Sequence, residues 1–216
     1  MLAITGLTAS RASATSVTYY LDVSSVTMGG SGPVGNAGTI TLDDVIDNDD
    51  IIKNQSNIVD VLVTLNPGYE FVKTGAGQSL AFNITGDPSI SILDVSAGFS
   101  VGLTTNDNSS PFGTFNYNIV CSGCGNGGSS PLPGPLTFDV QLSGITVDSF
   151  VANNLGFYFA ADVIGPDATG KRVTGNMAAG GSENPPVQIN AVPEPASLTL
   201  LGTGLMFGAR RLRRRK

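Results

Sequence analysis

Apolar and β-branched residues recur along the chain in short, partly alternating runs, and Gly, Pro, Asn or Asp punctuate the boundaries between them. Such runs are typical of β-strands, because successive side chains of a strand point to opposite faces of a sheet. No segment before residue 196 keeps the period of a long amphipathic helix. The pattern predicts eight or more strands, the best being 17–23, 39–42, 58–65, 80–85, 90–95, 114–120, 136–142 and 156–163.

Tight turns separate several of these strands. Residues 66–68, 86–88 and 165–167 each combine Pro with Gly or Asp, which supply the fixed or positive φ angles that tight turns need. Many short strands joined in this way predict an all-β fold. We expect residues 15–179 to form a single antiparallel β-sandwich domain, jelly-roll-like in arrangement.

One predicted strand, residues 58–65, is almost entirely apolar. Only Asp60 and Thr64 interrupt the run. Strands that are buried on both faces have such continuous apolar sequences. We therefore expect this strand to lie in the middle of its sheet, largely covered on both faces.

The last 24 residues, 193–216, have a different character. Pro193-Glu194-Pro195 is followed by an uncharged apolar run, 196–209, and then by a basic cluster: Arg210, Arg211, Arg213, Arg214, Arg215 and Lys216. Fourteen helical residues span about 21 Å, less than the roughly 30 Å of a bilayer's hydrocarbon core. A positive cluster behind an apolar segment keeps that end in the cytoplasm. The pattern predicts a short C-terminal membrane helix with a stop-transfer cluster.

This order of motif, apolar run and basic end resembles the C-terminal sorting signal of the PEP-CTERM family, whose members are exosortase substrates. The resemblance implies that a membrane-embedded exosortase recognises the region of Pro193, Glu194 and Pro195 and removes the helix and basic cluster. It also implies an exported precursor, anchored in the inner membrane and released to the cell surface or extracellular matrix. From the residues alone, a tail anchor or an uncut stop-transfer helix remains open. Residues 180–192, rich in Gly and Pro, would form the linker.

The N-terminal residues 1–14 have some features of a signal peptide. Residues 1–9 are mostly apolar, and Ala12-Ser13-Ala14 has the small-residue spacing of a signal-peptidase site, but no basic residue precedes the apolar run. We expect a residual signal-peptide-like segment with Thr15 as the first mature residue. An apolar first strand is the alternative.

The charge of the chain is unevenly distributed. Its net charge is −6, yet residues 1–209 hold five Lys and Arg against seventeen Asp and Glu, a net charge of −12. An acidic surface repels nucleic acid and anionic lipid. The processed protein should therefore bind no nucleic acid. Its acidic charge fits a protein of a secreted matrix or one that binds cations.

The densest acidic segment is a candidate calcium site. Asp43, Asp44, Asp47, Asp49 and Asp50 lie within eight residues, and carboxylate oxygens are the ligands that Ca²⁺ prefers. Their spacing does not fit the EF-hand loop, and a solvated acidic turn is the alternative. We expect no other cofactor.

The chain has two cysteines, Cys121 and Cys124, in a loop rich in Gly and Pro. It has no histidine, so zinc or haem binding through this pair is not indicated, and no helix follows to support redox chemistry. In an oxidising compartment this spacing predicts a local disulfide. A reactive or intermolecular pair is the alternative.

Three functions fit these features. The first is a non-enzymatic structural or interaction protein of the extracellular polysaccharide layer. The second is a carbohydrate-binding module, which would need aromatic platforms, and the candidates are Tyr19, Tyr20, Tyr69, Tyr117 and Tyr158. The third is a carboxylate-dependent hydrolase, which rests only on the abundance of Asp. The segment Gly98–Gly102 matches a nucleophile motif, but the chain has no histidine base.

Overall fold

The computed structural model describes residues 15–44, 57–74, 78–102, 107–180 and 187–190. They belong to a compact unit of residues 14–189, with only Asn190 in a second unit made of 1–13 and 190–216. The predicted signal-like segment, the sorting signal with its helix, and most of the acidic loop lie outside the described residues. The unit is an all-β fold of antiparallel strands, as predicted.

The first sheet contains five strands. Its order is β6 (Ser91–Leu93), β11 (Leu136–Gln141), β3 (Ile58–Leu65), β2 (Gly38–Asp43) and the first half of β1 (Thr15–Ser24). Apolar side chains alternate along β2 and β3, so one face of the sheet packs inward and the other faces outward.

The second sheet begins with the other half of β1. Its order continues through β13 (Arg172–Gly180), β12 (Phe157–Pro166), β5 (Gln78–Phe82), β10 (Tyr117–Val120) and β7 (Ser100–Val101). Two short strands are attached: β4 (Glu70–Phe71) pairs with β12, and β14 (Val187–Asn190) pairs with β1. The short pair β8 (Asp107–Asn108) and β9 (Thr114–Phe115) stands apart from both sheets.

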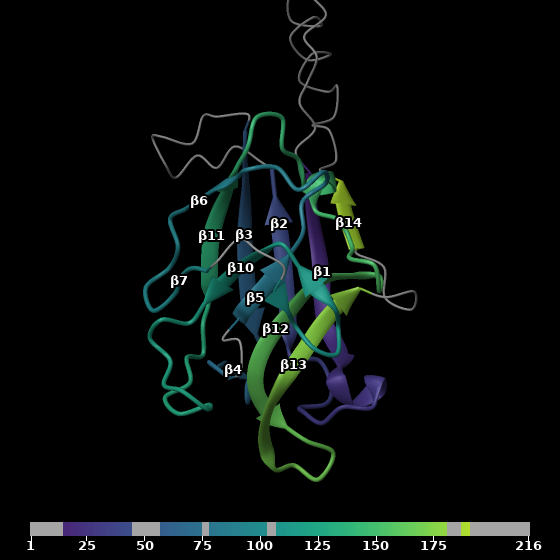
Figure 1. The fold of residues 1–216 in the computed structure, drawn as a ribbon, viewed down its shortest axis with the longest axis vertical. Helices are drawn as coiled ribbons and strands as arrows, with labels where there is room; N and C mark the ends of the chain where they lie inside the picture. Colours follow the sequence, from purple (N-terminus) through teal and green to yellow (C-terminus); the bar gives the residue numbers. More distant parts are fainter. Residues whose placement is uncertain (1–14, 45–56, 75–77, 103–106, 181–186, 191–216) are drawn as a thin grey trace, which may run out of the picture. The chain divides into compact units, whose positions relative to one another are not determined.

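Strand β1 belongs to both sheets. Residues Ser16 to Tyr20 pair with β2, whereas Leu21, Val23 and Ser24 pair with β13, and the register shifts between Leu21 and Val23. A bulge of this kind bends a strand and lets it pass from one sheet to the next. The long strands β1, β2 and β3 consequently lie behind the crossing pair β12 and β13 (Figure 1).

An aromatic cluster fills the space between the sheets. The ring of Phe82, on β5, lies 5.6 Å from those of Tyr117 and Phe150 and 5.7 Å from that of Phe138, which belongs to the first sheet. All four side chains are buried. Phe82 therefore joins the inner faces of the two sheets.

A second, smaller apolar cluster covers part of the outer face of the second sheet. Its members are Ala81, Phe112, Phe115, Phe157, Ala160 and Ala178. The rings of Phe112 and Phe157 are 4.9 Å apart. Residues 107–116, which include β8 and β9, thus pack on the outside of β12 and β13.

The predicted strands are largely confirmed, but the structure corrects four points. Residues 114–120 divide into β9 and β10, and β13 was not predicted. Strand β3 lies between β2 and β11 as expected, but it is covered on one face only, because its side chains alternate and Leu62 is 41% exposed. Within the predicted linker, residues 187–190 form β14 and Gly180 ends β13.

Candidate functional site

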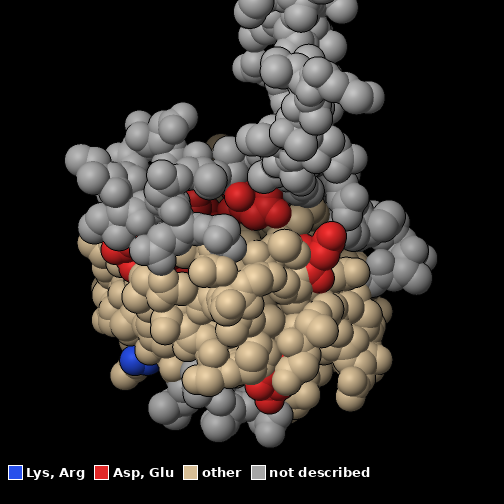
Figure 2. All heavy atoms as spheres, turned by 90° about the horizontal axis from the view of Figure 1, so that it is seen from above, with Lys and Arg blue, Asp and Glu red and all other residues tan. Residues whose placement is uncertain are grey.

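Carboxylates form a row on the outer face of the first sheet. Asp43 on β2 is opposite Asp60 on β3, and Asp60 is opposite Asp139 on β11. Residues paired in this way point to the same face, and with Asp94 they line a cavity of about 430 Å³. Figure 2 shows acidic groups beside the grey atoms on an otherwise mostly uncharged face.

This acidic row only partly overlaps the predicted calcium ligands. It includes Asp43, and Asp44 follows β2, but Asp47, Asp49 and Asp50 lie outside the described residues. Within the described ranges, no group of three His, Cys, Asp or Glu residues has an arrangement that could hold a metal ion. The calcium site stays a prediction.

The two cysteines lie together directly after β10. The sulfur atoms of Cys121 and Cys124 are at disulfide-bonding distance, and their Cα atoms are 5.3 Å apart. Both side chains are buried in the main core. The geometry agrees with the predicted local disulfide.

The five candidate tyrosines do not form an aromatic platform. Tyr19, Tyr69 and Tyr117 are buried in the core, and Tyr158 packs on Tyr19 with ring centroids 5.0 Å apart. Of the five tyrosines, Tyr20 is the most exposed, with 40% of its surface accessible. Tyr19, Tyr69 and Tyr117 cannot serve as a platform for a sugar, because their rings pack inside the sandwich core and leave no face for a ligand.

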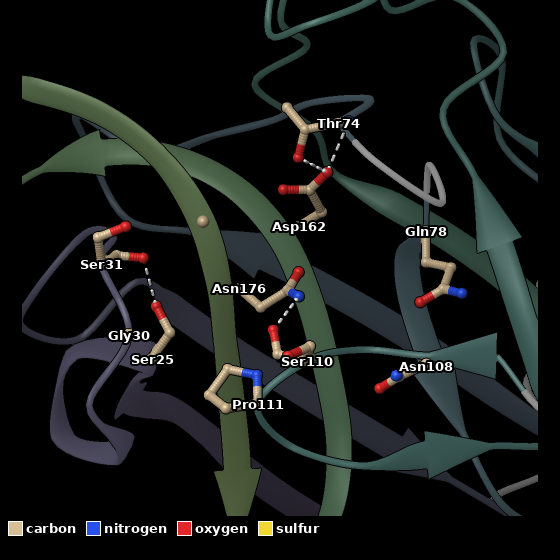
Figure 3. Close-up of a pocket in the computed structure, with 11 residues that line it drawn as sticks. Ser25, Gly30, Ser31, Thr74, Gln78, Asn108, Ser110, Pro111, Asp162 and Asn176 are labelled. Atoms are coloured by element: carbon tan, nitrogen blue, oxygen red, sulfur yellow. Dashed lines mark hydrogen bonds between the residues drawn. The ribbon is translucent and has the colours of Figure 1, made fainter.

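A polar cavity of about 330 Å³ lies on the outer face of the second sheet, beside the smaller apolar cluster. We call it the Asp162 pocket (Figure 3). Asp162 on β12 lies directly opposite Asn176 on β13, and Gln78 is the first residue of β5. Thr74 and residues 108–111 complete one side, and the segment 25–31 closes the other.

Close backbone packing places the segment 25–31 against β13. This segment includes the short 3₁₀ helix η1 (Ser25–Met28). A Cβ atom on Gly175 would lie only 2.8 Å from the Cα of Gly32, so these glycines allow the two backbones to approach. The hydroxyl of Ser25 donates to the carbonyl of Ser31 at 2.8 Å, which fixes the turn.

Asp162 is the charged group of the pocket. Its side chain is 3% exposed, and its Oδ2 accepts hydrogen bonds from the backbone N–H of Thr74 at 2.7 Å and from the Thr74 hydroxyl at 2.5 Å. Its Oδ1 is buried and has no hydrogen-bond partner. Burial raises the pKa of Asp162 to about 6 against the opposing effect of the Thr74 bonds, so the carboxyl is mainly ionised at neutral pH.

Gln78 contributes a hydrogen-bond donor to the pocket lining, whereas ionised Asp162 contributes an acceptor. It is 5% exposed, its Oε1 accepts from the hydroxyl of Ser109 at 2.7 Å, and its Nε2 is buried without a hydrogen-bond partner. Asn176 donates from Nδ2 to the carbonyl of Ser110 at 2.8 Å, which ties β13 to the segment 108–111. None of the described lining residues is basic or aromatic. The pocket therefore offers one carboxylate and several neutral polar groups.

Sequence reasoning missed Asp162, Gln78, Asp60 and Asp139. A signal was present for the aspartates, since each is the only charged residue of its strand. A charge in such a position is expensive to bury and points either to a partner or to a site. Gln78 carried no comparable signal.

The residues beyond the sandwich define the class of protein. Residues 196–209 form an uncharged apolar run, and a basic cluster follows it. The model of the PEP-CTERM protein-sorting motif matches residues 191–215. The chain thus carries a PEP-CTERM sorting motif, which implies export with a membrane-anchored precursor and recognition by an exosortase-type processing enzyme. The chain has no significant match among curated proteins or among solved structures.

The predicted membrane helix falls within the matched region and outside the described residues. Among the helices that the structure describes, none has the length and apolar character needed to cross a membrane.

Proposed function

We propose that this chain is a non-enzymatic structural or interaction protein of the cell surface or extracellular matrix, delivered there by its C-terminal signal. The observation that carries the proposal is the PEP-CTERM match at residues 191–215, which follows an all-β domain. In this role the signal serves delivery and the sandwich is the part that remains outside the cell.

The properties of the sandwich support such a destination. Removal of residues 210–216 would leave an acidic protein of net charge −12, which resists binding to anionic lipid and nucleic acid. The two cysteines at disulfide distance suit an oxidising compartment. Both features favour a protein that works outside the cytoplasm.

Mass spectrometry of the mature C-terminus from the native host tests this proposal. We expect the protein from cells with the exosortase to end near Pro195, and the protein from cells without it to retain Lys216. The double variant Pro193→Ala, Pro195→Ala should stay unprocessed, whereas the matched pair Pro185→Ala, Pro186→Ala should be processed normally. Retention of Lys216 in both strains would contradict the proposal.

Carbohydrate binding is the second candidate. The buried tyrosines remove the aromatic platform on which it first depended. The Asp162 pocket supports it instead, because carbohydrates are bound through hydrogen bonds from polar groups placed around a cavity.

A further inference from the structure

We propose that the peptide bond between Asp87 and Pro88 is a self-cleavage site, at which the carboxyl group of Asp87 cuts its own backbone. No other aspartate of the chain is followed by proline. The bond lies in the segment 83–90, which connects β5 of the second sheet with β6 of the first. The chemistry of the bond, its strained turn and its contacts with Tyr117 support this assignment.

An Asp–Pro bond places a nucleophile beside a good leaving group. The carboxyl group of an aspartate can close a five-membered ring on the backbone carbonyl carbon of its own residue. Such an attack within one residue needs no encounter with a second molecule. The proline nitrogen belongs to a tertiary amide, and it leaves once it has taken up a proton.

The reaction consumes one water molecule and needs no other reagent. A side-chain oxygen of Asp87 attacks the backbone carbonyl carbon, the bond from that carbon to the nitrogen of Pro88 breaks, and the carboxyl proton passes to this nitrogen. The products are a cyclic anhydride at Asp87 and a free amine at Pro88. Water then opens the anhydride, so the first fragment ends at Asp87 with two carboxyl groups.

The backbone is strained at the bond to be cut. Asp87 has a φ of +50°, and Gly86 before it has a φ of +76°. Aspartate tolerates the left-handed region better than most residues, but the ring of a following proline crowds the backbone of the residue before it. Cleavage removes that crowding, because it separates Asp87 from the proline ring. The folded chain is therefore closer to the transition state than a relaxed peptide is.

Tyr117 holds the residues on both sides of the bond. Its hydroxyl donates to the carbonyl oxygen of Pro88. Burial, and next a hydrogen bond with the side chain of Asp87, raise the pKa of Tyr117. The tyrosine is 3% exposed, and its ring stacks on that of Phe82 with centroids 5.6 Å apart. Tyr117 is thus a positioning residue, since a rigid core side chain fixes the carboxyl group and the proline relative to each other.

The surroundings of the turn allow the second step and keep the pieces together. Asp87 is exposed, so water can reach the anhydride. Before the bond, the backbone N–H of Thr85 donates to the carbonyl of Ser149 at 2.9 Å, and β5 pairs with β10 and β12. After the bond, β6 pairs with β11. The sandwich should therefore stay assembled from two polypeptide pieces after the cut.

The test is incubation of the purified full chain in detergent and mildly acidic buffer, followed by intact-mass spectrometry over several days. We expect fragments of residues 1–87 and 88–216. A parallel sample unfolded in urea reports on the same bond without the fold. Cleavage should be at least about fivefold faster in the folded chain, which is the factor that the strain of one such residue supplies. An intact wild-type chain, or equal rates with and without urea, would overturn the proposal.

Two variants test the chemistry of the bond. Asp87→Glu keeps the charge but would have to close a six-membered ring, and Pro88→Ala replaces the leaving group by a secondary amide. Each should be cut at least tenfold more slowly than the wild-type chain. Cleavage of Asp87→Glu at the wild-type rate would identify a contaminating protease and refute self-cleavage.

Asp94 is an internal control for the effect of the proline. It is exposed and has the same φ of +50°, but Val95 follows it. No fragment ending at Asp94 should appear, and equal cleavage there would mean unspecific acid hydrolysis and contradict the proposal.

Tyr117→Phe tests the positioning role. The variant keeps the ring that stacks on Phe82 but loses both hydrogen bonds of the hydroxyl. It should be cut more slowly than the wild-type chain when folded and at the same rate in urea. A purely structural tyrosine would leave both rates unchanged, and that result would remove Tyr117 from the site.

Discussion

Replacing Asp162 by Asn should make the sandwich more stable at neutral pH and remove part of its pH dependence. The folded-state pKa of this carboxyl is about 6, against 3.8 in the absence of the fold. Between about pH 4 and pH 6 the folded protein therefore holds more protons than the unfolded chain. Its stability falls as the pH rises through that window and stays lower above it.

The size of the effect follows from the shift in pKa. A difference of about two units, at 1.36 kcal/mol each, lowers the free energy of unfolding by about 3 kcal/mol at neutral pH. The Asn variant avoids this cost and can keep both Thr74 hydrogen bonds, which converge on one oxygen. The side-chain NH₂ of the new Asn is buried without a hydrogen-bond partner, which reduces the gain in stability by about 1 kcal/mol. We expect a net gain of about 2 kcal/mol, or about 4–8 °C in Tm.

Urea unfolding of the full chain from about pH 4 to about pH 8 measures this gain. The difference between variant and wild type should be small at the acidic end and should grow through the titration of Asp162. Asp148→Asn removes the same charge from an exposed position and should change the free energy of unfolding by less than about 0.5 kcal/mol at every pH. An Asp162→Asn variant no more stable than wild type at about pH 8 would refute the reasoning.

Two further predictions concern the backbone. Gly38→Ala should lower the free energy of unfolding by at least about 3 kcal/mol, since φ is +155° there and the added Cβ would lie 2.2 Å from the carbonyl oxygen of Thr64. Gly144→Ala, with φ of +75° and open space around it, should cost only about 1 kcal/mol in the same urea assay, and equal costs would contradict the close approach. Reduction of the Cys121–Cys124 bond should cost about 2 kcal/mol by loop entropy, so identical melting of oxidised and reduced protein would argue against the disulfide.

The alternation of apolar residues predicted most strands because each strand buries one face. Residues 58–65 and 136–142 became β3 and β11 almost without change of bounds. The sequence pattern did not predict strand β13, because its residues, Arg-Val-Thr-Gly-Asn-Met-Ala-Ala-Gly, include several types that are uncommon in strands. It is a strand because β12 and β1 supply hydrogen-bonding partners on both sides. Such pairing overrides local propensity.

The sites differed in how far sequence could predict them. The sorting signal is read along the chain, so consecutive residues around Pro193 were sufficient. The acidic row depends on the register that places Asp60 between Asp43 and Asp139, and the Asp162 pocket depends on packing outside the second sheet. Neither arrangement is visible in a local pattern, because the residues that meet are distant in sequence.

The pairing of β1 with β13 has a consequence for folding. Leu21 is among the first described residues of the domain, yet its partner in the second sheet is Ala179, near the end. The sheets therefore cannot be joined until almost the whole domain has been synthesised, and folds dominated by such distant contacts form slowly. Until β13 is available, the second half of β1 lacks its partner in the second sheet, so the domain stays open during most of its synthesis.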